Sequence, residues 1–316
     1  MKEIGIMEVG GFKVGHAQNL EAGTGLTVIL LDHMSPAGLD VRGGGPASRE
    51  SQILSPLMTA EGINAVVLSG GSAFGLDAAG GVQKYLEERG EGFAVGPIRV
   101  PLVCQSCVFD LGVGRYDIRP DAAMAYAACE NASYNAPQEG NVGAGTGCTV
   151  GKIMGPDRAM KTGFGTYAVQ AGAIKVGAMV AVNAAGDVCA ADGTVLSGLL
   201  SADHTHCESS FEAMIQGLEL QSGVNTTIGA VVTNVKLPKA KLCKVAGMTH
   251  NGYARAIRPV HTSGDGDSIY ALSTGTVEGS MDAVGALAAY AMEQAIRRAA
   301  MAADSAYGYK AWKDLT

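Results

Sequence analysis

The sequence predicts an α+β fold in which sheets of paired strands pack together and helices cover them from outside. Segments with helical periodicity lie early and late in the chain, with strand patterns between them. Across residues 142–182, several short strand patterns alternate with glycine turns, and no long helical pattern interrupts them. Hydrophobic residues make up 47% of the 316 residues and charged residues 17%, so a large core can be buried. This order favours α+β over a regular βαβ alternation.

Short runs rich in β-branched and aliphatic residues predict buried strands. They lie at residues 26–32, 65–68, 176–182, 228–233 and 268–272. Glycine-rich loops follow the first two runs, at residues 42–46 and 69–72. Glycine lets a backbone turn sharply or approach another segment closely, so these loops are candidates for tight packing.

Apolar residues at helical spacing predict four helices. The first is expected over residues 48–58, because a serine opens the apolar pattern there. The second opens at Ser72, a candidate N-cap, and runs to residue 85. The third has an apolar face of Leu242, Val245, Met248 and Ile257. The fourth is expected over residues 280–301.

Charge and cysteine content exclude several classes of partner. The net charge is −7 with a pI of about 5.4, and no basic stripe is present. Nucleic acids and anionic membranes are therefore not expected as partners. Seven scattered cysteines, no apolar signal core and no apolar run of about 18 residues predict a soluble cytoplasmic protein.

The most informative motif is Val224-Asn225-Thr226-Thr227-Ile228, where a hydroxyl residue opens an apolar strand deep inside the chain. Cleavage of the Asn225–Thr226 bond would give Thr226 a free α-amine beside its hydroxyl. Because an α-amine has a pKa near ~8, it can act at neutral pH as base for that hydroxyl. The alternatives are a glycosylation sequon, which requires secretion, and ordinary turn chemistry before a strand. Residues 208–222, just upstream, are predicted to form an exposed connection.

Four further polar residues are candidates for the same site. Asp265 and Asp267 precede a predicted strand at positions i and i+2, so both can reach one side and hold the amine of Thr226. Their alternative is an ordinary acidic turn. Lys152 is either a solvated tip or a buried cation that orients a reacting group. Asn183, at the end of an apolar run, is either a structural turn or a donor to a substrate oxyanion.

Three other motifs suggest different chemistry but match less well. The stretch Gly70-Gly71-Ser72-Ala73-Phe74 has phenylalanine where a serine-hydrolase elbow needs glycine. Residues 141–147 lack the spacing of a dinucleotide fingerprint or a Walker loop. Cys104 and Cys107, together with the group His204, His206 and Cys207, suggest zinc, and a zinc hydrolase would use the second group. These two groups lie far apart in sequence, and free cysteine is commonly a small buried hydrophobe, so no metal site is predicted.

Taken as a whole, the sequence resembles the DmpA-type family of self-cleaving aminopeptidases and amidases, peptidase family S58. The Asp-x-Asp pair resembles the branch that contains the nylon-oligomer hydrolase. The resemblance is carried by residues 14–16, 23–25, 40–44, 68–77, 143–152, 176–186, 225–227 and 258–274. It runs nearly end to end and implies a single domain, residues 1–316, with a four-layer α/β/β/α sandwich of the N-terminal-nucleophile type.

The resemblance also implies a role for each candidate residue. Autocleavage is expected between Asn225 and Thr226, giving fragments 1–225 and 226–316 that stay associated. Thr226 matches the nucleophile of both cleavage and turnover, and Asn183 the oxyanion donor. Lys152 matches a lysine that positions the nucleophile. Asp265 and Asp267 match the two carboxylates of the branch.

Phe109 departs from the family pattern, because some members have a tyrosine there that supplies a hydroxyl near the substrate. Phe109 is therefore expected to contact substrate without that donor. The resemblance implies a small peptide or amide as substrate, no cofactor and a homo-oligomer, commonly a tetramer. The alternative from another class is an unprocessed, non-catalytic oligomeric binding protein with the same fold.

Overall fold

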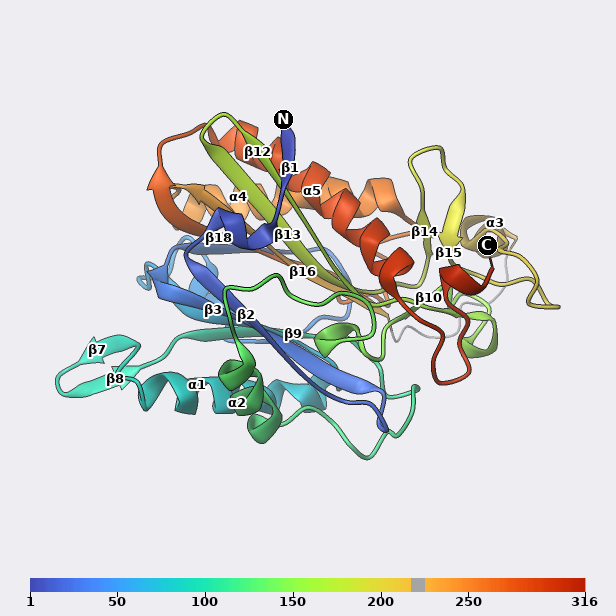
Figure 1. The fold of residues 1–316 in the computed structure, drawn as a ribbon, viewed down its shortest axis with the longest axis horizontal. Coiled ribbons are helices and arrows are strands. Elements are labelled where there is room, and N and C mark those ends of the chain that lie inside the picture. The colour runs from blue at the N-terminus through green and yellow to red at the C-terminus, as the bar shows by residue number, and fades with distance from the viewer. Residues whose placement is uncertain (217–224, 316) are drawn as a thin grey trace.

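Four layers make up the computed structural model, which describes residues 1–216 and 225–315 (Figure 1). Helices α4 (Lys239–Ala256) and α5 (Met281–Ala302) cover one face of a six-stranded sheet. The other face packs on a five-stranded sheet, whose far side is covered by α1 (Ala79–Glu87) and α2 (Ala122–Asn131). The predicted α+β fold and its four-layer α/β/β/α arrangement are therefore confirmed.

The six-stranded sheet has one parallel pair at its centre. Its strands in spatial order are β1 (Lys2–Ile4), β12 (Phe164–Ala171), β13 (Ile174–Asn183), β16 (Thr226–Val235), β18 (Ser268–Val277) and β4 (Ala37–Val41). Strands β16 and β18 run parallel, and every other neighbouring pair is antiparallel. Because β16 and β18 are parallel, α4 carries the chain back between them, and both strands start at the same edge.

The five-stranded sheet has the order β2 (Phe12–Asn19), β3 (Thr24–Ser35), β6 (Ile63–Ser69), β9 (Val103–Cys107) and β5 (Ala47–Arg49). Smaller sheets consist of β7 (Phe93–Val95) with β8 (Ile98–Val100), β10 (Thr149–Val150) with β11 (Met160–Lys161), and β14 (Asp187–Cys189) between β15 (Val195–Ser197) and β17 (Ile257–Arg258). A short helix, α3, spans Ser210–Ile215. The 3₁₀ helices of the described residues are Ile6–Val9, Ser51–Leu54, Ser72–Ala78, Gly143–Gly145, Pro156–Arg158 and Trp312–Asp314.

Strict alternation of side chains explains why both sheets are buried on both faces. In β13, Val176 and Val180 face the helices α4 and α5, whereas Met179 faces the other sheet. In β3, Val28 faces α1 and α2, and Ile29 faces the six-stranded sheet. A register shift of one residue would exchange these sets, so the apolar pattern specifies the pairing.

Most of the predicted elements are confirmed. The five predicted strands lie within β3, β6, β13, β16 and β18. Helix α5 begins after Ser280, whose side chain accepts a hydrogen bond from the N–H of Ala283 and caps the helix. Helix α4 ends at Ala256, and Ile257 already belongs to β17.

The helix expected over residues 48–58 is wrong. Residues Ala47–Arg49 form β5, which pairs with β9, and only the 3₁₀ turn Ser51–Leu54 follows. Leu57 is 87% exposed, so the apolar pattern of this segment does not mark one buried face. Tertiary pairing with β9 therefore overrides the local signal.

The predicted N-cap role of Ser72 is also wrong. Ser72 has a left-handed backbone with φ +52°, and the 3₁₀ helix that it opens has no side-chain cap. Helix α1 starts only at Ala79. The predicted exposed connection over residues 208–222 falls partly on residues 217–222, which lie outside the described residues. In its described part, Phe211 and Ile215 of α3 are exposed.

None of the described helices is both long enough and apolar enough to cross a membrane.

Two neighbouring glycines in α1 are expected to respond in opposite ways to alanine. A Cβ atom at Gly81 would lie 1.9 Å from the carbonyl oxygen of Ala122 at the start of α2. A Cβ atom at Gly80 would have no heavy atom of the described residues within 4 Å. Gly81→Ala is therefore expected to destabilise the fold by about 1–3 kcal/mol. Gly80→Ala is expected to stabilise it by about 0.5–1 kcal/mol, because alanine favours the helix. Urea denaturation of both variants measures this, and equal stabilities would contradict the close α1–α2 packing.

Candidate active site

Strand pairing brings the predicted site residues together at one edge of the six-stranded sheet. Thr226 is the first residue of β16 and lies opposite Asn183, the last residue of the antiparallel strand β13. On the other side, Asn225 forms a parallel bridge with Asp265, which comes just before β18. The amide of one neighbouring strand and the acidic loop of the other therefore flank the Asn225–Thr226 bond.

The hydroxyl of Thr226 lies against the peptide bond that precedes it. Thr226 Oγ1 donates to the carbonyl oxygen of Asn225, and both residues are less than a tenth exposed. The backbone N–H of Gly266 donates to Thr226 Oγ1 at 3.1 Å and to the Asn225 oxygen at 3.2 Å. A nucleophilic oxygen and an N–H donor therefore both contact the same carbonyl group.

Glycine is required at position 266 because of this close approach. A Cβ atom there would lie 2.8 Å from Thr226 Oγ1 and 2.9 Å from the carbonyl oxygen of Gly45. The predicted glycine loop at residues 42–46 packs on the same segment, since Gly45 N donates to Asp265 O at 2.8 Å. The density of glycine in that loop thus serves to hold the acidic loop beside Thr226.

The two carboxylates of the acidic loop have different surroundings. Asp267 is 1% exposed, and its Oδ1 accepts the N–H of Thr227 at 2.7 Å, one residue after the Asn225–Thr226 bond. Its Oδ2 accepts His261 Nδ1 at 2.7 Å and His261 N at 3.2 Å. Asp265 Oδ2 accepts the N–H and the hydroxyl of Thr262, at 2.8 and 2.6 Å, whereas its buried Oδ1 has no hydrogen-bond partner among the described residues. Burial, and secondly the negative charge of Asp267, raise the pKa of Asp265.

Lys152 and Asn183 form a second polar group at this edge. Lys152 Nζ donates to both Asn183 O and Asn183 Oδ1, at 3.0 and 2.8 Å. Oδ1 also accepts Thr149 N at 3.0 Å, and Asn183 Nδ2 donates to the carbonyl oxygen of Phe109 at 2.9 Å. These partners determine the orientation of the amide. They also show that Lys152 is not a solvated tip.

Burial of the Lys152 amine changes its protonation state near neutral pH. Although the residue retains partial exposure, desolvation of the amine lowers its pKa to about 7, against the opposing attraction of the Asp265 and Asp110 carboxylates. A substantial fraction of Lys152 is therefore neutral near pH 7. A neutral amine has two N–H groups and one lone pair, and Asn183 provides acceptors for both N–H groups.

The other sequence motifs do not assemble into a site. Gly143–Gly145 is a buried 3₁₀ turn in which the Ala144 N–H donates to Thr27 Oγ1, so this segment packs against β3. Cys104 and Cys107 lie buried in β9. His204, His206 and Cys207 lie between β15 and α3. Among the residues that the structure describes, no three His, Cys, Asp or Glu side chains are grouped to hold a metal ion.

Sequence reasoning missed three participants in the site. Gly266 and His261 contact Thr226 and Asp267, but neither has a signal of its own beyond its place near the acidic pair. Asp110, next to Phe109, acts on Lys152 through its negative charge, and it accepts Thr24 Oγ1 at 2.6 Å and Gly71 N at 2.7 Å. Burial raises the pKa of Asp110 to about 6. No sequence pattern marks Asp110, because its partners come from distant loops.

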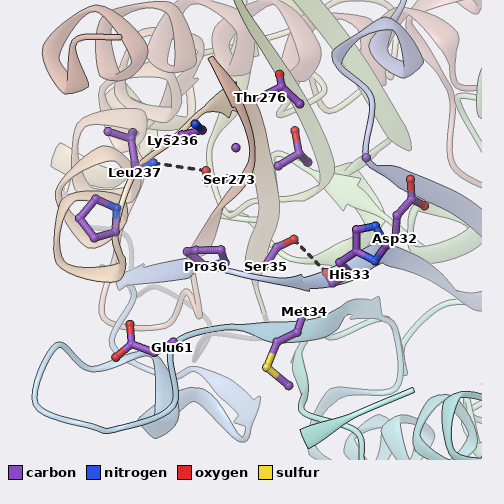
Figure 2. A pocket seen from close by; sticks show the side chains of 14 residues that line it. Asp32, His33, Met34, Ser35, Pro36, Glu61, Lys236, Leu237, Ser273 and Thr276 are labelled. Carbon is purple, nitrogen blue, oxygen red and sulfur yellow. Dashed lines mark hydrogen bonds between the residues drawn. The ribbon is translucent and has the colours of Figure 1, made fainter. Parts of the chain in front are cut away.

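A cavity of about 600 Å³ lies at the opposite end of β16, where the strand ends before Lys236 (Figure 2). Figure 2 shows Asp32, Glu61 and Lys236 around it, with Ser35 and Ser273 engaged in hydrogen bonds to backbone atoms. Because β16 separates it from Thr226 by its whole length, this cavity is not part of the candidate active site.

Comparison with known proteins identifies the family. The model of peptidase family S58 matches residues 5–313. The chain belongs to peptidase family S58. The resemblance inferred from the sequence is thus confirmed, and the family and its relatives mark the chain as a hydrolase of the aminopeptidase and amidase class.

The chain is similar to relatives of two kinds. It is 35% identical over 340 residues to an uncharacterized aminopeptidase of Mycobacterium leprae, covering 96% of this chain and 91% of that protein. It is 30% identical over 273 residues to the 6-aminohexanoate-oligomer endohydrolase of Agromyces sp., covering 85% of this chain and 74% of that protein.

Solved structures with a similar fold include the l-aminopeptidase d-ala-esterase/amidase of Ochrobactrum anthropi, described as a variant of the Ntn hydrolase fold. The TM-score is 0.70 at 18% identity, over 95% of this chain and 86% of that one. A β-aminopeptidase of Burkholderia sp. has a TM-score of 0.68 at 20% identity, with the same coverage of 95% and 86%. These likenesses show the fold.

Proposed function

We propose that this protein is a self-cleaving N-terminal-nucleophile hydrolase whose nucleophile is Thr226. The observation that carries the proposal is the contact of Thr226 Oγ1 with the Asn225 carbonyl, together with the Gly266 N–H that donates to both oxygens. An attacking oxygen and a donor for the developing oxyanion are the two groups that acyl transfer requires.

Self-cleavage begins with attack of Thr226 Oγ1 on the carbonyl carbon of Asn225. The negative charge on the Asn225 oxygen is stabilised by the Gly266 N–H. Collapse breaks the C–N bond, so the acyl group passes to Oγ1 as an ester and the nitrogen of Thr226 gains a proton. Water then hydrolyses the ester, which leaves a carboxylate on Asn225 and frees both the hydroxyl and the α-amine of Thr226.

Lys152 is the base that we assign to the first cleavage, because the α-amine does not exist before it. Its amine donates to Asn183, which lies opposite Thr226 on the neighbouring strand. In the neutral form both N–H groups bind Asn183, and a lone pair remains to accept a proton. A base with a pKa near the working pH is the most effective.

In turnover, the α-amine of Thr226 takes the proton of its own hydroxyl, which attacks the substrate carbonyl and forms an acyl-enzyme that water hydrolyses. Asp267 contacts the adjacent Thr227 N–H, and Asp265 has an unpartnered oxygen for the new ammonium group. One hydrogen of Asn183 Nδ2 is bound by Phe109 O, and the other is left for the substrate oxyanion. No step requires a cofactor.

The substrates of this activity are small peptides or amides derived from amino acids. Amide hydrolysis is common to the names of the aminopeptidase and oligomer-hydrolase relatives. Phe109 contacts the site through its backbone carbonyl and offers no side-chain hydroxyl to a substrate. The two fragments are expected to stay together, because β16 of the small fragment lies between β13 of the large fragment and β18.

The intact mass of the purified wild-type chain tests this proposal. Two species are expected, residues 1–225 and 226–316, which elute together under native conditions and separate on denaturation. N-terminal sequencing of the smaller one is expected to begin at Thr226. A chain that stays whole through long incubation at neutral pH and hydrolyses no aminoacyl amide would contradict the proposal and favour the non-catalytic binding protein.

A further inference from the structure

His261 donates two hydrogen bonds to Oδ2 of Asp267, one through its backbone N–H and one through Nδ1. Asp267 Oδ1, the other oxygen, accepts the Thr227 N–H at 2.7 Å. Because an ionised carboxylate only accepts hydrogen bonds, Nδ1 of His261 carries the proton in this contact. The imidazole thus orients the Asp267 carboxylate so that its Oδ1 atom faces the Thr227 N–H of β16.

The protein holds His261 in place from two further directions. The ring stacks on Tyr253 of α4 with centroids 5.8 Å apart, and the edge-to-face neighbour His250 has its centroid at 4.8 Å. His261 also has a left-handed backbone with φ +59°. This conformation is strained for a non-glycine residue, so it persists where surrounding contacts determine it.

Tyr253, which stacks on His261, also contacts β16 through its buried hydroxyl. It donates to Thr227 O at 3.3 Å, so α4 contacts β16 beside the nucleophile as well as the imidazole that directs Asp267. Within the part of the chain that the structure describes, the buried Nε2 atom of His261 has no hydrogen-bond partner, whereas Nδ1 has one. The function of the ring therefore lies in the Nδ1 contact.

We propose that His261 is a positioning residue that acts through Asp267 to fix the start of β16, and hence Thr226, against the scissile carbonyl. This inference rests on the proposed function, since it concerns the placement of Thr226 as nucleophile. Without the imidazole, Asp267 can rotate and its contact with the Thr227 N–H is lost or shifted. A misplacement of about 1 Å at a reacting atom costs up to about 100-fold in rate.

Two substitutions that both tolerate the left-handed backbone test the role of Nδ1. Glycine and asparagine both tolerate the left-handed conformation at position 261, but only asparagine has an amide N–H near the place of Nδ1. His261→Gly is expected to slow self-cleavage and to lower kcat on an aminoacyl amide by about 10- to 100-fold, with KM little changed. His261→Asn is expected to recover most of that loss.

A double-mutant cycle shows whether His261 acts through Asp267. If it does, His261→Gly has little further effect on self-cleavage in a chain that already carries Asp267→Asn. Additive losses in the double variant would overturn the inference. So would an asparagine variant as slow as the glycine variant at equal thermal stability, or a glycine variant as fast as the wild type.

Failure of the inference can be distinguished from failure of the proposed function. A wild-type chain that does not cleave at Asn225–Thr226 contradicts the proposed function, whatever the His261 variants do. A wild type that cleaves normally, beside a His261→Gly chain that cleaves at the same rate, contradicts only the role of His261. If His261→Gly does not fold, His261→Asp takes its place in the same cycle, because aspartate tolerates the left-handed backbone but has no side-chain N–H to donate.

Discussion

Replacing Thr226 with alanine is expected to leave the chain whole and to lower amide hydrolysis by about 10⁴-fold or more, since loss of a covalent nucleophile removes the reaction path itself. Alanine has no oxygen to attack the Asn225 carbonyl, and it removes the hydrogen bond from the Gly266 N–H. The side chain is small and buried at the end of a strand, so the fold is expected to persist. Intact mass and turnover of an aminoacyl amide, with circular dichroism for folding, measure the three quantities.

Thr226→Ser is the matched control, because it keeps the hydroxyl and removes only a methyl group. The serine chain is expected to cleave and to retain measurable turnover. An alanine chain that still hydrolyses the substrate would show that another residue is the nucleophile. A serine chain as inert as the alanine chain would show that the hydroxyl is not the decisive group at this position.

Much of the fold could be predicted from the sequence, because its strands are apolar on both faces. The runs within β13, β16 and β18 are long, β-branched and uninterrupted, which is typical of strands in the middle of a sandwich. The helix pattern of α5 is equally clear and has its cap at Ser280. The order of the layers came from the family resemblance, since periodicity alone does not determine which sheet packs on which.

The elements that were predicted wrongly depend on distant partners. The segment around Ala47–Arg49 forms a strand only because β9 offers it an edge, and nothing in its own residues shows that. Ser72 takes a left-handed backbone beside the end of β6, where its N–H donates to Val108 O. Both outcomes are set by tertiary contacts that a local pattern does not contain.

The same distinction applies to the candidate site. Thr226, Asn183 and the Asp265–Asp267 pair carry chemistry in their side chains, so their types and spacing made them visible. Gly266 contributes a backbone N–H and close approach, which no side-chain motif reveals. His261 contributes through Asp267, and its place is evident only once the loop is folded. A motif therefore points to the proposed reacting groups, whereas the groups that contact and orient them are evident only from the structure.

Lys152→Met is expected to reduce self-cleavage by about 100-fold or more, because general-base catalysis contributes roughly 10²–10⁴-fold. The wild-type rate is expected to rise about 10-fold per pH unit below pH 7 and to level off above it, because the lowered pKa of about 7 sets where the amine becomes neutral. Chains made by cell-free synthesis and sampled over time between pH 5.5 and 9 provide the measurement.

The sign of this pH dependence shows whether Lys152 acts as a general base or as a cation that positions the nucleophile. If the lysine acts only as a cation that positions the nucleophile, the rate falls as pH rises through about 7, because the charge is then lost. Lys152→Arg separates them independently, since arginine keeps the charge and cannot serve as a base. We expect the arginine chain to remain as uncleaved as the methionine chain. Rapid cleavage of the arginine chain would assign Lys152 to positioning and leave the first proton transfer to another group. Asp265 is then the candidate, because its pKa is raised and its Oδ1 has no partner among the described residues.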